Sequence, residues 1–181
     1  MSTCTHSTIS SSQASSSSEL IKIPKLPFCI STILKEIVKQ NEDAAYNPDD
    51  PFSTESISKV DVEYYIGRIK KYTGIENSTL VLALVYSDRI CAKTGLILQP
   101  HNVHRIILCC IIIAIKYNED SYYANDYYAK VGGVSTEELR RLEYYFIQAI
   151  DFDLYVDNEL LEKYKELLVS YGRGKMEKAK N

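Results

Sequence analysis

The sequence predicts an all-α fold, and two observations carry that prediction. Apolar residues recur at helical spacing along the chain, for example at Val62, Tyr65, Ile66 and Ile69. A continuous apolar run, Ile106 to Ile115, lies inside a segment of about 16 residues, whereas a strand usually has about 5–6. We recognise no reliable strand pattern, and the apolar run is expected to be a helix buried at the centre of the core.

Capping and helix-breaking residues divide the chain into helices. A first periodic segment covers residues 28–38, and the polar, proline-containing stretch 40–56 that follows is expected to be a loop. Ser58 with Asp61 resembles a helix start, and Gly74 is expected to end that helix. Further helices are expected over residues 79–93, 102–117, 125–130, 135–150 and 158–171.

Serine and glycine mark the ends of the later helices. Ser135 is followed three residues later by Glu138, which matches the capping-box pattern. Gly172 and Gly174 are expected to end the last helix. The pattern therefore predicts about five helices between residues 58 and 152, with one helix before them and one after.

Both ends of the chain have a composition that does not favour a packed core. Residues 1–18 contain 12 serines and threonines, so the segment 1–20 is expected to be a disordered tail. The short basic segment 173–181 is expected to be a flexible, solvated tail. Residues 21–50 are assigned to the N-terminal helix and its loop.

Charge and cysteine content exclude several function classes. The net charge is -3, and no basic stripe interrupts the folded part, which argues against nucleic-acid binding. No apolar segment reaches the roughly 20 residues that a membrane helix needs. The five cysteines show no metal-binding or disulfide spacing, which favours a reducing compartment, and we expect the protein in the cytoplasm, the nucleus or both.

Motifs for catalysis or for cofactor binding are absent from the sequence. Gly132-Gly133 lacks the lysine placement of a phosphate-binding loop. His101 and His104 would share one helical face, either as two metal ligands or as helix-entry residues, and a metal site needs further ligands that the pattern does not supply. We therefore expect no enzyme, no metal, no cofactor and no small-molecule substrate, although an enzyme built on a helical bundle is kept as a third class.

Four charged residues lie in apolar surroundings. Arg68 and Asp88 each interrupt an apolar helix, and they are expected either to pair with each other or to face solvent. Lys116 ends the apolar run, and Glu143 lies between Leu142 and an aromatic stretch. These two residues are interpreted either as ordinary surface charges or as a polar pair that contacts a partner's backbone.

Three segments in order resemble the cyclin box, the five-helix bundle of cyclins. Tyr86 to Ile90 resembles the Tyr-x-Asp-Arg motif of the second box helix, and Ala114 to Tyr117 resembles the end of the third. Leu142 to Phe146, followed by Phe152 and Leu154, resembles the fifth helix and its exit.

The finer resemblance is to the phosphate-pathway (PHO-type, P/U-type) cyclins. It rests on segments that fall in the family's order, namely residues 65–69, 102–105, 120–125, 128–134 and 138–139. The resemblance covers about residues 51–156. It implies a single five-helix cyclin box there, with one flanking helix on each side and residues 157–172 as the C-terminal one.

By this resemblance the chain is the regulatory, activating subunit of a cyclin-dependent kinase, in a heterodimer with it, bound beside the kinase's mobile C helix. Phosphate signalling and the cell cycle are the processes implied. Lys116 and Glu143 would contact backbone groups of that helix. The kinase-binding surface would also include Tyr117, Glu119, Asp120, Tyr123, Asn125, Lys130 and Arg140. The alternative is a cyclin-fold interaction module or transcription-type adaptor without a kinase.

The chain departs from the family at two places. The first box helix lacks the Met-Arg-Ala-Ile-Leu-like patch with which cell-cycle cyclins dock substrates, so that docking mode is not expected. Arg140 stands where the subfamily often has asparagine, which is expected to alter the kinase interface.

Overall fold

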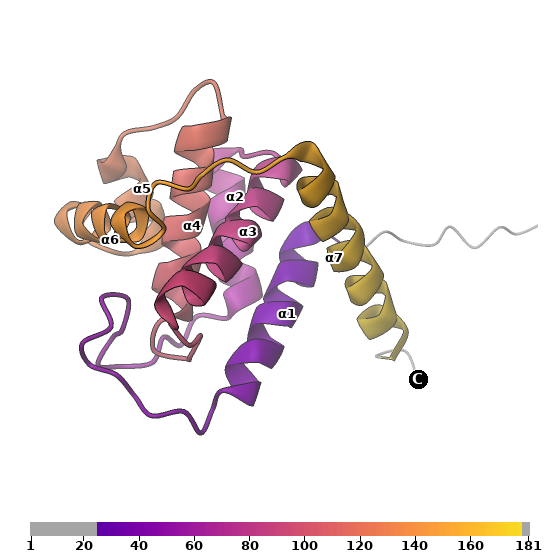
Figure 1. The fold of residues 1–181 in the computed structure, drawn as a ribbon, viewed down its shortest axis with the longest axis horizontal. Coiled ribbons are helices and arrows are strands. Elements are labelled where there is room, and N and C mark those ends of the chain that lie inside the picture. Colours follow the sequence, from indigo (N-terminus) through magenta and orange to yellow (C-terminus); the bar gives the residue numbers. More distant parts are fainter. Residues whose placement is uncertain (1–24, 179–181) are drawn as a thin grey trace, which may run out of the picture.

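The computed structural model describes residues 25–178, and these residues form seven α-helices and no strand. Their order along the chain is α1 (Leu26–Gln40), α2 (Val62–Thr73), α3 (Asn77–Thr94), α4 (Val103–Asn118), α5 (Asn125–Gly132), α6 (Thr136–Ala149) and α7 (Asn158–Lys178). The all-α prediction is confirmed. Five helices, α2 to α6, lie within residues 51–156, and along the chain α1 precedes them and α7 follows them. In space α1 and α7 pack against each other on the same side of the bundle (Figure 1).

Helix α4 is the centre of the core. Every side chain from Ile106 to Ile115 is buried, as the apolar run predicts. Helix α3 packs along α4, and α2 and α6 also contact it (Figure 1). A helix that is apolar on all sides gains stability only when other helices surround it, so α4 holds the bundle together.

The helix starts differ in part from the sequence prediction. Asp61, and not Ser58, caps α2, and its carboxylate accepts hydrogen bonds from the amides of Glu63 and Tyr64. Ser135 caps α6 as predicted and accepts from the Glu138 amide at 3.0 Å. The Glu138 side chain does not complete the capping box, because it pairs with Arg105 of α4 at 2.5 Å.

The segment between α1 and α2 is irregular, as predicted, and the start of α4 anchors it. The His101 ring lies 2.7 Å from the Thr54 carbonyl oxygen, and the His104 ring lies 2.7 Å from the Val60 carbonyl oxygen. The side chain of the buried Asn102 donates to the Asp50 carboxylate at 2.8 Å. The two histidines therefore fasten a loop to the bundle.

The last helix is longer than the sequence predicts. Gly172 and Gly174 do not end it, and the basic segment that was expected to be flexible is helical as far as Lys178. Glycine inside a helix costs about 1 kcal/mol relative to alanine, which packing can offset. Here Gly172 is buried, and Tyr171 and Lys175 both bind the Glu36 carboxylate of α1.

The predicted disordered tail, residues 1–20, lies outside the residues that the structure describes. Within residues 25–178 no helix is both long and apolar enough to cross a membrane.

We predict that Gly132→Ala destabilises the fold. A Cβ atom at this position would lie 2.4 Å from Leu108 Cδ2, and Leu108 is buried in α4 and has little room to move. Overpacking of this kind costs about 1–3 kcal/mol, which urea unfolding would measure. Gly67→Ala is the matched control, since a Cβ there meets nothing within 4 Å and should stabilise α2 slightly. Equal stability of Gly132→Ala and the wild type would contradict the packing argument.

We also predict that stability falls as pH drops below about 6.5, in part because of His104. Burial lowers the pKa of His104, and its Nδ1 is a buried atom without a hydrogen-bond partner among the described residues. The unfolded chain therefore takes up the proton at a higher pH than the folded chain, and stability is lost between the two pKa values. Urea unfolding at pH 7.5 and 5.5 should show a smaller pH effect in His104→Gln than in the wild type. Parallel pH dependence in the two proteins would contradict this role.

Candidate functional site

Three helices converge on one polar cluster at the end of α4. Lys116 lies in the last turn of α4, Asn125 is the first residue of α5, and Glu143 lies in the middle of α6. The buried run of α4 ends at Ile115, so Lys116 emerges where the core meets solvent. The fold thus brings together three residues that are far apart in sequence.

The three side chains form a closed hydrogen-bonded triad. Lys116 Nζ donates to Glu143 Oε1 and to Asn125 Oδ1, both at 2.6 Å, and Asn125 Nδ2 donates to Glu143 Oε2 at 2.5 Å. The exposed fraction of the side chain is 30% for Lys116 and 12% for Glu143. They are therefore not two independent surface charges.

The triad leaves hydrogen-bonding capacity at the surface. An ammonium group has three donors, and the triad uses two of those of Lys116. Each carboxylate oxygen has two lone pairs, and Glu143 uses one on each oxygen. Lys116 and Glu143 thus keep one donor and two acceptor positions, and such partly exposed groups suit the free backbone groups at a helix end.

Glu119 does not bind the triad but contacts α3 and the residue before it. Its carboxylate accepts from the Thr79 hydroxyl at 2.5 Å and from the Glu76 amide at 3.2 Å. These bonds tie the end of α4 to the start of α3. Its neighbour Asp120 is exposed.

The other candidate residues fall into two groups. Tyr117 and Tyr123 are exposed, and the Tyr123 ring packs on Tyr127, with 4.3 Å between centroids. Lys130 and Arg140 are exposed as well, and neither side chain belongs to the triad.

The predicted pair of Arg68 with Asp88 is wrong. Arg68 donates to the Lys130 carbonyl oxygen at 3.2 Å, and Asp88 accepts from the Tyr164 hydroxyl of α7 at 2.8 Å. Both side chains lie at the edge of the bundle, where backbone and hydroxyl groups provide partners. Burial raises the pKa of Asp88, and the Tyr164 hydrogen bond opposes that rise.

The Tyr-x-Asp-Arg motif of α3 holds the connector between α6 and α7. The Tyr86 hydroxyl donates to the Leu154 carbonyl oxygen at 2.8 Å, and burial raises the pKa of this tyrosine. Arg89 donates to the carbonyl oxygens of Asp153 and Tyr155. Because Asp88 binds α7 itself, the three polar residues of the motif fix both the connector and the helix that follows.

Phe152 is a feature that sequence reasoning did not assign to the site. Asp151 and Phe152 both have positive φ, 57° and 55°, although neither is glycine. Such residues cost about 1–3 kcal/mol each and persist where the surroundings impose them. Here Lys93 binds the Ile150 carbonyl oxygen, and the turn leaves the Phe152 side chain 62% exposed. The motif Phe152-x-Leu154 does not by itself predict this exposure, which follows from the turn.

Comparison with known proteins places these features in one family. The cyclin family model matches residues 2–154 of the chain. Cyclin-U2-2 of Arabidopsis thaliana is 41% identical over 133 residues, which cover 71% of this chain and 58% of the relative. PHO85 cyclin-7 of Saccharomyces cerevisiae is 32% identical over 151 residues, covering 77% of this chain and 53% of the relative.

A second plant relative, Cyclin-U2-1 of Arabidopsis thaliana, is 35% identical over 167 residues, covering 87% of this chain and 75% of the relative. The chain spans only about half the length of other curated relatives that it matches, such as Cyclin-U2-2 and PHO85 cyclin-7. The predicted similarity to PHO-type and P/U-type cyclins is confirmed at the level of sequence.

We predict an energetic coupling of about 1 kcal/mol between Lys116 and Glu143. A double-mutant cycle with Lys116→Met and Glu143→Gln, followed by urea unfolding, measures it. The matched control is the exposed pair of Lys165 and Glu162 on α7, 3.0 Å apart, for which about 0.3–0.5 kcal/mol is expected. A coupling no larger than that of the control would contradict a structured triad.

Proposed function

The chain belongs to the cyclin family, and from that premise we propose that it is the regulatory, activating subunit of a cyclin-dependent kinase. The observation that carries the proposal is the triad of Lys116, Asn125 and Glu143, a rigid polar cluster with spare donors and acceptors at the rim of the core.

In this proposal the triad binds the kinase beside its mobile C helix. The Lys116 ammonium donates to carbonyl oxygens at a helix end, and the Glu143 carboxylate accepts from backbone amides. Holding the C helix inward completes the lysine–glutamate ion pair and the metal geometry that phosphoryl transfer requires. Asn125 acts as a positioning residue, because it fixes both charged groups.

Exposed aromatic residues extend the proposed interface. Phe152, Tyr117 and Tyr123 are large and exposed, and a partner would shield their apolar surface from water. The strained turn at Phe152 fits this role, since strain of this kind is retained where it presents a side chain. Glu119 is assigned to the fold, because its carboxylate holds α3.

We propose that the partner is a PHO85-type kinase, because relatives such as PHO85 cyclin-7 are named for it. Members of the cyclin family are regulatory subunits, and we propose that this chain is likewise not an enzyme. A one-to-one heterodimer, a place in phosphate signalling or the cell cycle, and a cytoplasmic or nuclear location complete the proposal.

The adaptor without a kinase is the competing function, and the similarity to PHO85 cyclins favours the kinase subunit over it. The enzyme on a helical bundle has no support from the family match.

A charge swap tests the kinase proposal. The double variant Lys116→Glu with Glu143→Lys keeps an ion pair within the triad and reverses the charges that a partner meets. We expect co-purification of the kinase from the native organism to be lost and the helical circular dichroism signal to stay unchanged.

The control for this experiment is Lys163→Glu, an exposed position on α7 outside the triad. It should leave kinase co-purification at the wild-type level. Retention of the kinase by the charge-swapped protein would refute the role of the triad, and failure of the wild type to retain any kinase would favour the adaptor.

A further inference from the structure

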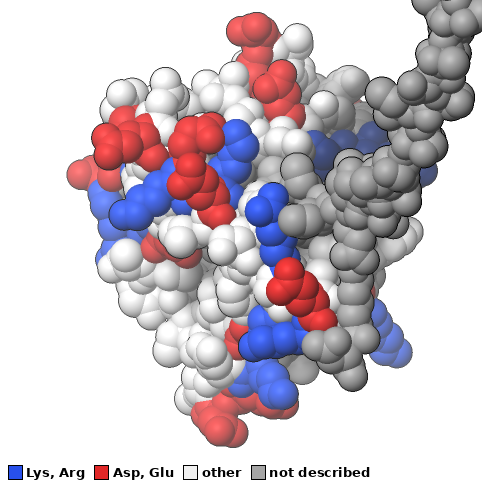
Figure 2. Space-filling model, turned by 90° about the vertical axis from the view of Figure 1, so that its right-hand side faces the viewer, with Lys and Arg blue, Asp and Glu red and all other residues white. Residues whose placement is uncertain are grey.

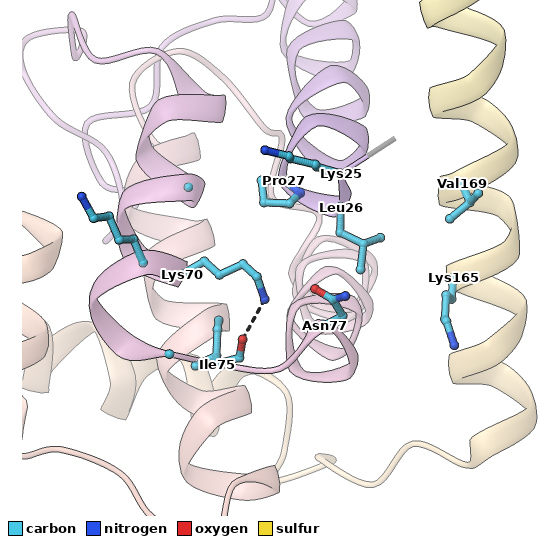
Figure 3. Close-up of a pocket in the computed structure, with 11 residues that line it drawn as sticks. Lys25, Leu26, Pro27, Lys70, Ile75, Asn77, Lys165 and Val169 are labelled. Atoms are coloured by element: carbon cyan, nitrogen blue, oxygen red, sulfur yellow. Dashed lines mark hydrogen bonds between the residues drawn. The ribbon is translucent and has the colours of Figure 1, made fainter. Parts of the chain in front are cut away.

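A groove runs between the start of α1, the outer face of α2 and helix α7, as Figure 3 shows. Its volume is about 640 Å³. A second hollow of about 530 Å³ adjoins it and shares with it Lys25, Pro27, Gly67 and Lys71. Together the two hollows form one groove along α2.

The wall of the first hollow is basic. Lys25, Lys70, Lys71 and Lys165 line it, and no acidic residue is among the described residues that do so. Figure 2 shows the two signs of charge interspersed over the visible part of this side of the molecule. Two lysines have partners nearby: Lys70 donates to the Ile75 carbonyl oxygen at 2.7 Å, and Lys165 pairs with Glu162.

Apolar residues complete the lining. Leu26 of α1, Ile75 of the turn after α2 and Val169 of α7 line the groove, and of these Val169 is the most exposed, since Leu26 and Ile75 are buried. The second hollow carries Asp61 and Glu63 as well as Arg68, so only the end toward α7 is uniformly basic. A ligand in the first hollow would therefore contact apolar side chains and lie near several lysines.

Gly67 lines both hollows, and its lack of a side chain is a second feature of the groove. It lies inside α2, where glycine costs up to about 1 kcal/mol relative to alanine. Packing within the chain does not require it, because a Cβ atom there meets nothing within 4 Å, whereas one at Gly132 would collide with Leu108. Its missing side chain instead keeps both hollows open, which allows a ligand to approach the α2 backbone closely.

We propose that this groove docks an acidic peptide segment, bearing one apolar side chain, from a protein partner. The lysines attract its carboxylates, and the apolar lining takes the apolar side chain. The triad lies where α4, α5 and α6 meet, on the other side of the bundle from α7, so both surfaces are accessible at once (Figure 1). The proposal does not depend on the kinase interaction.

The test is fluorescence anisotropy of the labelled peptide Asp-Glu-Glu-Leu-Asp-Glu with the full chain. We expect saturable binding, weakened on the order of tenfold in Lys71→Glu with Lys165→Glu, since two attractions become repulsions. Gly67→Gln should weaken binding at least about fivefold without lowering the unfolding midpoint, because glutamine is a good helix former that fills the groove. Lys163→Glu on α7 should bind as the wild type does.

The apolar contact and the choice of ligand class are tested separately. Replacing the peptide's leucine by alanine should weaken binding, and replacing its acids by lysine should abolish it. No binding by the wild type, equal binding by Lys71→Glu with Lys165→Glu and by Lys163→Glu, or tighter binding of a single-stranded oligonucleotide would overturn the proposal. Kinase co-purification measured on the same variants should be unchanged, which separates a failure here from a failure of the kinase proposal.

Discussion

Helix α4 is buried on all sides, and this burial determines where the neighbouring helices and the surface residues at its end lie. Ten consecutive residues, Ile106 to Ile115, are removed from water, so α2, α3 and α6 must surround the helix. A helix held in this way has little freedom to rotate or slide, because core packing is dense. Lys116, in the last turn of α4, therefore has a fixed position at the surface, where it binds Asn125 and Glu143.

A second set of contacts extends this rigidity to the end of the bundle. Tyr86 and Arg89 of α3 bind carbonyl oxygens of the segment after α6, and Asp88 binds Tyr164 of α7. Helix α3 also packs along α4. The position of the connector, including the strained turn at Phe152, therefore depends on the same core helix. The exposed aromatic side chain and the triad thus belong to one rigid framework.

The flanking helices add a surface of a different chemistry. Helices α1 and α7 contact each other through Glu36, Tyr171 and Lys175, and α1 also packs on α2. Residues from these three helices line the basic groove, in which Gly67 leaves space. The protein thus carries a compact polar triad on one side and a basic groove on the other.

Local periodicity and capping were enough to predict the helical class, the order of the helices and the buried run. The sequence also singled out Lys116 and Glu143, since each stands out against apolar neighbours. The partners of the polar side chains became evident only in the folded chain: Asn125 closes the triad, Glu119 holds α3, and Arg68 and Asp88 bind elsewhere. The folded chain also shows that α7 continues through Gly172. The physical reason is that hydrogen-bond partners and helix ends depend on which distant groups packing brings within about 3 Å, and local sequence does not contain that information.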